Sequence, residues 1–281
     1  MPAINTITAE KLARLVGLPS APALIDVRAP HELAVSPLLI PGAVWHDAAS
    51  VAVWADQYRG RATIVVCNDG RESSQGAAAW LRQSGSPSEV LEGGLTAWAA
   101  AKLPTVPQAV LPPRDAQGRT VWVTRARPKV DRVACPWLIR RFVDPNAVFL
   151  YVPTAEVMGV AARHNGAAFD IDAPGVAFGH DGQQCSFDAM LQAFGLSSIA
   201  PLARLSLIVR GADTDHLNIA PEAAGLLAVS LGLSRMFADD IEQLVAGMTV
   251  YDALYRWCRD ATGEVHNWTS HQPAAARDPA P

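Results

Sequence analysis

The stretch Ile64-Val65-Val66-Cys67-Asn68-Asp69-Gly70-Arg71-Glu72-Ser73 decides the fold of the first part of this chain. Its β-branched residues predict a short buried strand, the polar residues a loop, and the pattern of residues 73–82 a helix. Cys67 therefore lies where a strand ends and a loop leads into a helix. Backbone N–H groups of such a loop, with the positive end of the helix, stabilise a thiolate or a persulfide. Cys67 is accordingly the candidate nucleophile.

The rest of this loop supplies the candidate active-site residues. Gly70 allows the backbone to curl, and Arg71 offers a fixed cation to an anionic sulfur donor such as thiosulfate. The remaining members of the active-site loop are Asn68, Asp69, Gly70, Glu72 and Ser73.

Strands and helices alternate on both sides of this loop. Thr8 is the expected cap of a helix over residues 9–16. The other expected elements are strands over 24–27 and 89–91 and a helix over 95–101. This order predicts an α/β fold, a parallel sheet with helices on both faces.

Residues 1–107 resemble the rhodanese family. The motifs that carry the resemblance occur in the family's order: Leu24-Ile25-Asp26-Val27-Arg28 with Glu32, Ile40-Pro41-Gly42-Ala43, the Cys67 loop, and Leu91-Glu92-Gly93-Gly94 with Trp98. The resemblance implies that Cys67 accepts sulfane sulfur from a small-molecule donor and passes it to a thiophilic acceptor. It implies no required cofactor, and it makes Asp26 and Arg28 a partly buried structural pair.

Two positions depart from the rhodanese pattern. Glu72 stands where the family usually has arginine, and Leu39 stands where it usually has histidine. An acidic residue beside the thiol repels anionic donors and disfavours the thiolate, so weak activity toward thiosulfate is expected. Arg71 compensates in part.

The chain of 281 residues is long enough for two domains. Prolines gather between residues 103 and 118, which predicts an exposed linker that continues neither helix nor sheet. We therefore expect a rhodanese-like domain over 1–108, a linker over 109–119, a second domain over 120–260 and a disordered tail over 261–281.

The second domain is predicted to be helix-rich and α+β. Strands are expected over 121–124 and 205–209, and Pro136 is expected either to kink a helix over 131–142 or to lie in its first turn. Further helices are expected over 221–231, 239–246 and 251–259. In the last of these, Cys258 shares a face with Tyr251, Leu254 and Tyr255, which indicates core packing.

The most cationic segment spans residues 125–141. Guanidinium groups bind tetrahedral oxyanions through paired N–H donors, so Arg132, Arg140 and Arg141 are candidates for binding chromate, sulfate or phosphate. A solvated helix face has the same composition.

Polar groups of the second domain offer further candidates: Asp131, His180, Cys185, Asp213 and Asp215. Asp213 and Asp215 are expected at the end of the strand over 205–209, where α/β proteins often bind ligands. The spacing matches no dedicated metal motif, so any metal is unknown, and loops stabilised by Asx turns and caps explain the same residues.

Residues 120–260 resemble the C-terminal domain of the ChrB family of chromate-resistance proteins. The motifs are Asp131-Arg132, Cys135-Pro136-Trp137-Leu138-Ile139-Arg140-Arg141-Phe142, Cys185-Ser186-Phe187-Asp188, Val209-Arg210-Gly211-Ala212-Asp213, and Tyr251-Asp252-Ala253-Leu254-Tyr255 with Trp257-Cys258. The resemblance implies a role in chromate resistance. Because a rhodanese-like domain replaces the regulator's own N-terminal region, it does not imply direct transcriptional control.

Composition excludes several classes of protein. The net charge is −4, which argues against DNA as a partner, because duplex-binding domains carry a cationic excess. Apolar runs are too short to cross a bilayer, and the N-terminus does not resemble an export signal. The four cysteines form no close pair, which favours reduced thiols and a cytoplasmic location.

The leading hypothesis is a sulfurtransferase coupled to an oxyanion-responsive domain. The alternative is a non-enzymatic chromate or oxyanion sensor with an inactive rhodanese domain, and Glu72 favours it. A DNA-binding repressor is a third hypothesis, for which the sequence offers no recognition helix.

Overall fold

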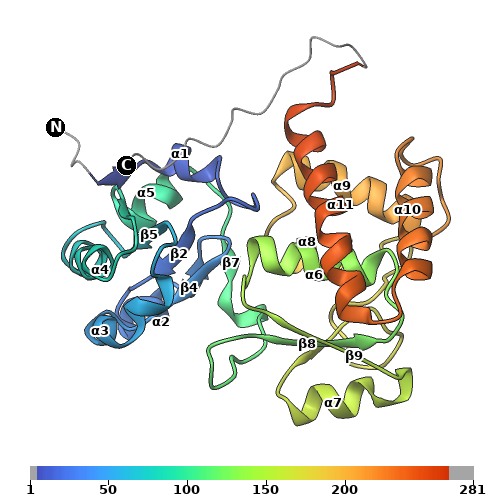
Figure 1. The fold of residues 1–281 in the computed structure, drawn as a ribbon, viewed down its shortest axis with the longest axis horizontal. Coiled ribbons are helices and arrows are strands. Elements are labelled where there is room, and N and C mark those ends of the chain that lie inside the picture. The colour runs from blue at the N-terminus through green and yellow to red at the C-terminus, as the bar shows by residue number, and fades with distance from the viewer. Residues whose placement is uncertain (1–4, 266–281) are drawn as a thin grey trace.

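The structure is a computed structural model that describes residues 5–265 (Figure 1). The tail predicted over 261–281 lies mostly outside the described residues, and residues 261–263 form a turn after the last helix.

The first domain is built on a five-stranded sheet in which all pairings are parallel, with the strand order β1-β6-β5-β2-β4. The strands are β1 (Thr6–Ile7), β2 (Ala23–Asp26), β4 (Ala43–Trp45), β5 (Thr63–Val66) and β6 (Ser88–Leu91). The helices are α1 (Ala9–Ala13), α2 (Pro30–Val35), α3 (Val51–Trp54), α4 (Glu72–Gln83) and α5 (Gly94–Ala100). As predicted, the oxygen of Thr8 caps α1 by accepting from the N–H of Lys11.

Helices cover both faces of this sheet, which confirms the predicted fold class. Side chains alternate along β5, so Ile64 packs with Leu12 of α1, whereas Val65 packs with Leu81 of α4. The sheet is therefore a buried central layer.

The connection between the domains is half-buried rather than an exposed linker. A short antiparallel pair joins β3 (Leu38–Leu39) to β7 (Val106–Pro107), and a 3-10 turn follows at Gln108–Val110. Leu111 packs against the core, and Arg114 forms an ion pair of 3.2 Å with buried Asp144. Apolar residues among the prolines anchor this segment, which the prediction from proline content missed.

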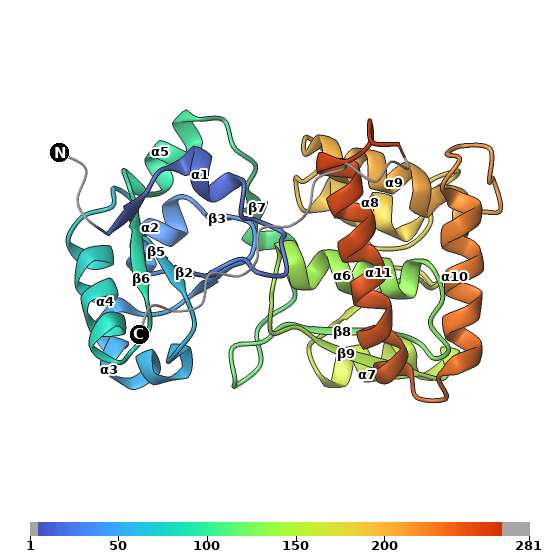
Figure 2. The ribbon, with the colours of Figure 1, turned by 45° about the horizontal axis from the view of Figure 1, so that its top comes forward.

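The second domain contains a parallel sheet of three strands in the order β10-β8-β9. The strands are β8 (Val121–Arg125), β9 (Val148–Val152) and β10 (Ala167–Ala168). The helices are α6 (Asp131–Phe142), α7 (Val157–Arg163), α8 (Ser186–Ala193), α9 (Ala200–Asp213), α10 (Ala223–Met236) and α11 (Asp240–Asp260). Helix α7 covers one face of the sheet, and α6 and α8 lie on the other (Figures 1 and 2).

The strand predicted over residues 205–209 is wrong, because this segment lies inside α9. Leu205, Ile208 and Val209 are all fully buried. A short run of apolar residues fits a buried helix as well as a buried strand, so periodicity alone did not separate them.

The two helices predicted over 239–246 and 251–259 form the single helix α11. Gly247 lies in the middle of it, and a Cβ at that position would stand 2.5 Å from Cγ1 of Val133 on α6. This glycine is therefore explained by the close approach of two helices rather than by a break.

Helix α6 continues through Pro136, which is its sixth residue and not in the first turn. Proline has no N–H, so the carbonyl of Arg132 loses its usual helical donor. The hydroxyl of Tyr151 on β9 donates to that carbonyl at 2.8 Å and replaces the missing bond.

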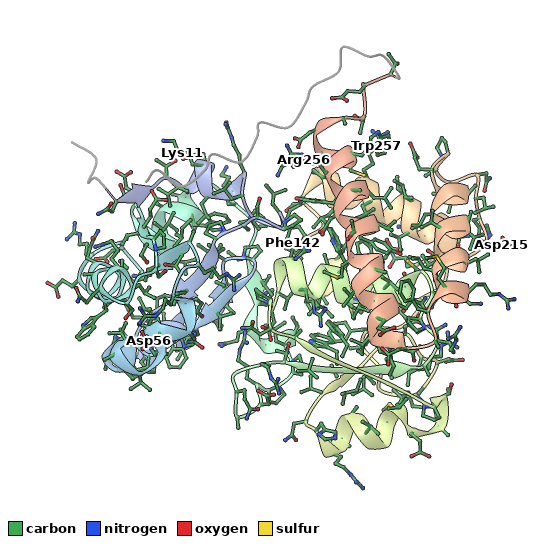
Figure 3. The ribbon with its side chains drawn as sticks, in the orientation of Figure 1. Lys11, Asp56, Phe142, Asp215, Arg256 and Trp257 are labelled. Atoms are coloured by element: carbon green, nitrogen blue, oxygen red, sulfur yellow. The ribbon has the colours of Figure 1, made fainter. Side chains whose placement is uncertain are left out.

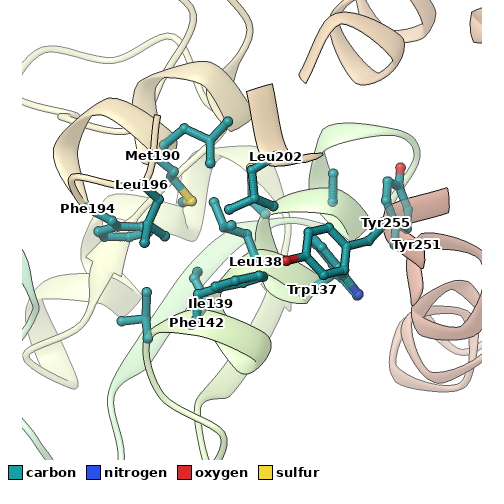
Figure 4. Packing of buried hydrophobic residues seen from close by; sticks show 14 of the residues in the cluster. Trp137, Leu138, Ile139, Phe142, Met190, Phe194, Leu196, Leu202, Tyr251 and Tyr255 are labelled. Atoms are coloured by element: carbon teal, nitrogen blue, oxygen red, sulfur yellow. The ribbon is translucent and has the colours of Figure 1, made fainter. Parts of the chain in front are cut away.

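The two domains share one apolar core. Phe142, at the end of α6, lies between them (Figure 3) and packs on Tyr255 within the cluster of Figure 4. Its carbonyl accepts from the N–H of Gly42 at 2.7 Å, and its ring fills the space beside Gly17. Trp98 of the first domain belongs to the same cluster.

Within residues 5–265, no helix is both long enough and apolar enough to cross a membrane.

Candidate functional site

Cys67 stands at the carboxyl end of β5 with its thiol held inside the loop, and the residue is only 3% exposed. Its Sγ accepts from the N–H of Gly70 at 3.2 Å and lies 3.1 Å from Oγ of Ser74. The N–H of Gly70 is thus a donor to sulfur, whereas the hydroxyl of Ser74 also donates to the carbonyl of Arg71 and the thiol lies 3.4 Å from a carboxylate oxygen of Asp69. The sequence did not single out Ser74, because its contact with the Cys67 thiol is made by the folded loop and leaves no sequence pattern.

Glycines explain the shape of the loop. Gly70 has a φ of +74°, and a Cβ there would lie 2.6 Å from the carbonyl oxygen of Leu91. Gly94 has a φ of +57°, and a Cβ there would lie 2.3 Å from the carbonyl oxygen of Cys67. The Cys67 loop and the start of α5 are therefore packed backbone to backbone, which fixes the position of the thiol.

The charged residues of the loop point outward. The side chain of Arg71 is 82% exposed and stands 3.8 Å from the carboxylate of Asp69. Asn68, Glu72 and Ser73 are also exposed, and Glu72 begins α4. These residues form the rim that a donor or acceptor meets first.

Asp26 and Arg28 form a buried ion pair with N and O 2.6 Å apart. Two N–H groups of Arg28 also donate to the carbonyls of Ser36 and Leu38. The pair therefore ties β2 to the following loop and is buried more completely than the resemblance implied.

The three basic candidates of the second domain bind different partners. Nε of Arg132 lies 3.1 Å from Asp170, and Arg141 forms a bidentate pair with Asp252. Arg140 stacks over Phe149. Arg140 and Arg141 line one surface pocket together with Arg61, but Arg132 does not lie there.

Acidic residues and a histidine do converge in the second domain. Nε2 of His180 lies 3.1 Å from Asp213, 3.5 Å from Asp170 and 3.8 Å from Asp131. Ligand atoms of Asp131, Asp170 and His180 all lie within 4.8 Å of one another. We call these four residues the acid–histidine cluster.

Electrostatics in the cluster reflect uncompensated negative charge. Burial, together with the carboxylates of Asp213 and Asp170, raises the pKa of Asp131 well above its usual value. Burial and Asp170 raise the pKa of Asp213, and the hydrogen bond with Asp170 raises that of His180. Only the side chain of His180, at 44% exposed, is substantially open to solvent.

Three of the four cluster residues were candidates from sequence, and Asp170 was not. It follows the two-residue strand β10, which is too short to give a pattern. Asp215 is exposed on the turn after α9, and in Figure 3 it lies at the outer edge of the domain. Cys185 is fully buried, and burial raises the pKa of its thiol.

The fold and the two sites define a two-domain class: a rhodanese-like sheet with a cysteine loop, followed by a helix-rich α+β domain with an acid–histidine cluster. Residues 8–101 match the rhodanese-like domain family. Residues 122–258 match the family described as ChrB, C-terminal domain. The two family matches therefore fall one on each domain of the structure.

Among curated proteins, the chain is similar to Protein ChrB of Cupriavidus metallidurans. The two are 38% identical over 143 residues, which cover 51% of this chain and 42% of ChrB. The chain thus matches less than half of the length of this relative.

Solved structures resemble part of the chain. A rhodanese-related protein from Thermoplasma volcanium is 25% identical with a TM-score of 0.32, covering 36% of this chain and 97% of that one. A thiosulfate sulfurtransferase from Pseudomonas aeruginosa is 28% identical with a TM-score of 0.31. The match covers 37% of this chain and 19% of that one.

Proposed function

We propose that this protein is a sulfurtransferase that carries sulfane sulfur as a persulfide on Cys67. The observation that carries the proposal is the thiol environment: Sγ accepts from the N–H of Gly70 and contacts Ser74 at the start of α4. An anionic sulfur placed there is stabilised by fixed dipoles without a cofactor. The match of residues 8–101 to the rhodanese-like family supports the same reading.

The chemistry takes two displacements. The Cys67 thiolate attacks the sulfane sulfur of a donor such as thiosulfate, and the donor's S–S bond breaks as sulfite leaves with the electron pair. A thiophilic acceptor then attacks the outer sulfur of the persulfide, and Cys67 leaves as a thiolate. Arg71 attracts the anionic donor to the rim, and Glu72 opposes it, so thiosulfate is expected to be a modest donor.

The second domain connects this activity to chromate resistance in our proposal. Chromate oxidises thiols, so a protein that supplies reduced or sulfane sulfur beside a chromate-responsive domain is suited to detoxification. All four cysteines are free thiols, which suits the reducing cytoplasm.

The first test is persulfide formation on the full chain. We expect thiosulfate or 3-mercaptopyruvate to add one sulfur to the wild-type mass, with sulfur release to cyanide, and Cys67→Ser to lose both. Cys258→Ser, which changes a cysteine buried far along the chain on α11, is the matched control and should behave as the wild type.

The competing function is a non-enzymatic oxyanion sensor. The near-complete burial of Cys67 and the exposed Glu72 favour it. It predicts no persulfide from either donor, together with a higher unfolding temperature in chromate or sulfate. That combination would replace the sulfurtransferase proposal.

A further inference from the structure

We propose that the second domain binds a divalent metal ion between Asp131, Asp170, Asp213 and His180. Carboxylate oxygens with a single imidazole form a mainly hard ligand set, which suits Mn²⁺ or Fe²⁺ better than a thiolate-preferring ion. This site is separate from the Cys67 loop and does not depend on sulfur transfer.

The fold brings the four ligands together from four separate segments. Asp131 is the first residue of α6, Asp170 follows β10, His180 lies in the loop before α8, and Asp213 ends α9. Strands β8 and β10 are parallel, so Asp170 and the connection from β8 to α6 lie at the same edge of the sheet. The carboxyl edge of a parallel sheet is where such folds bind ligands.

The distances fit a coordination shell. Nε2 of His180 is 3.1, 3.5 and 3.8 Å from oxygens of Asp213, Asp170 and Asp131. Ligands about 2.1 Å from a metal stand about 3.0 Å apart in an octahedron and about 3.4 Å apart in a tetrahedron. The His180–Asp213 and His180–Asp170 distances are already in this range. The ligand atoms of Asp131, Asp170 and His180 lie within 4.8 Å of one another, so the carboxylates would have to move inward to bind one ion.

One oxygen in the cluster has no partner. The Asp131 side chain is 1% exposed, and its Oδ1 accepts no hydrogen bond of normal length, although the thiol of Cys185 interacts with this carboxylate and lowers its pKa. An unsatisfied carboxylate oxygen in the interior costs free energy that a bound cation offsets. The hydroxyl of Thr124, near the carboxyl end of β8, is likewise buried without a partner.

The other carboxylate oxygens are held in place by donors. Oγ of Ser186 donates to Asp170 at 2.9 Å, and the N–H of Phe187 donates to Oδ2 of Asp131 at 3.3 Å. The N–H of Asp131 itself donates to Oδ1 of Asp213 at 3.3 Å. Carboxylates oriented in this way are typical of metal ligands.

Charge also favours a cation. Arg132 pairs closely with Asp170, and Arg125 lies 3.7 Å from the same carboxylate. Within residues 5–265, neither arginine forms an ion pair with Asp131 or Asp213, and the ion-pair partner of both carboxylates is His180. With His180 neutral, three carboxylates and two guanidinium groups leave one net negative charge in the cluster, which favours a bound cation.

Access is available from one side. A surface pocket lined by Arg125, Asp170, Asp172 and His180 opens beside the cluster. An ion can enter here, and a solvent molecule can complete its coordination. Cys135 and Cys185 are fully buried, and burial raises the pKa of both thiols, which disfavours them as ligands.

The test uses the full chain stripped with EDTA and titrated with MnCl₂. We expect one Mn²⁺ per chain, seen as loss of the free-ion EPR signal, and a higher unfolding temperature on binding. Asp131→Asn and Asp213→Asn keep the side-chain volume and should weaken Mn²⁺ binding at least tenfold. Using both variants guards against a folding defect in one, which circular dichroism would reveal.

Asp215→Asn is the matched control, because Asp215 lies two residues beyond Asp213 on an exposed turn. It should bind Mn²⁺ as the wild type does, and so should Cys67→Ser. Absence of Mn²⁺ binding to the wild type, or equal binding by folded Asp131→Asn and Asp213→Asn, would overturn the proposal.

Discussion

At the scale of single residues, His46 shows how burial controls ionisation. Its ring stacks on Trp54, and its Nε2 lies 2.8 Å from the hydroxyl of Tyr58. Burial and the positive charge of Arg114 lower the pKa of His46 to about 4. The folded state therefore holds this ring neutral at pH values where the unfolded chain protonates it.

The pH dependence of stability follows from this shift. Because the folded pKa is below the unfolded value of 6.5, the stabilisation is complete above pH 6.5 and declines as the pH falls toward 4. We expect His46→Gln to remove about 1–2 kcal/mol of the acid-induced loss between pH 7 and 4.5, since partial solvation reduces the full linkage effect. Urea unfolding at both pH values measures it.

The exposed His31 on α2 provides the control for that measurement. His31→Gln should leave the pH dependence of the free energy of unfolding as in the wild type. If His46→Gln also leaves it unchanged, the neutral state of His46 makes no contribution to stability.

Site residues could be predicted where they are neighbours in the sequence, and not where the fold brings them together from distant segments. The Cys67 loop is one stretch of chain in which strand, glycine and helix start follow one another, so its location was evident. The acid–histidine cluster draws on four distant segments. Asp131, His180 and Asp213 stood out only as polar residues, and Asp170 did not stand out at all.

At the scale of elements, α6 depends on a strand to complete its hydrogen bonds. Tyr151→Phe removes the donor to the carbonyl of Arg132 and should cost about 1–3 kcal/mol, since it leaves a carbonyl unsatisfied. Pro136→Ala restores an N–H four residues after Arg132. In the Pro136→Ala variant, Tyr151→Phe should lower the free energy of unfolding by less than it does in the wild type. A double-mutant cycle by urea unfolding measures the difference.

Equal costs of Tyr151→Phe in the two backgrounds would show that the hydroxyl does not replace the missing helical bond. Sequence reasoning located the bounds of α6 correctly but had no means of finding Tyr151, because the compensating donor comes from a different element. The error at residues 205–209 has a different cause: the exposed position in this run is occupied by Leu207, so no polar residue marks the outer face of the helix.

At the scale of the whole molecule, the contact between Gly17 and Phe142 joins the domains. Gly17 has a φ of +80°, and a Cβ there would stand 2.2 Å from the Phe142 ring. Gly60 has a φ of +74° with no atom within 4 Å of its Cβ position. Both positions would therefore strain the backbone of an alanine, but only at Gly17 would its Cβ also clash with a neighbour.

We predict that Gly60→Ala lowers the free energy of unfolding by about 1–2 kcal/mol and that Gly17→Ala lowers it by several kcal/mol more. Chemical denaturation measures both. Phe142→Ala alone should cost about 3–5 kcal/mol. Adding Gly17→Ala to Phe142→Ala should then cost little more than Gly60→Ala does. A Gly17→Ala cost equal to that of Gly60→Ala would mean that the ring yields freely and the domains are not locked here.

The bond from Tyr151 to Arg132 also bears on the order of events in folding. An isolated peptide of residues 131–142 is short and lacks the Tyr151 hydroxyl that donates to the carbonyl of Arg132. It should therefore be largely unstructured in water. The helix gains full stability only once β9 has paired with β8 and presented the hydroxyl. We therefore expect the pairing of β8 with β9 to be formed in the folding transition state, and the full set of α6 hydrogen bonds to form after it.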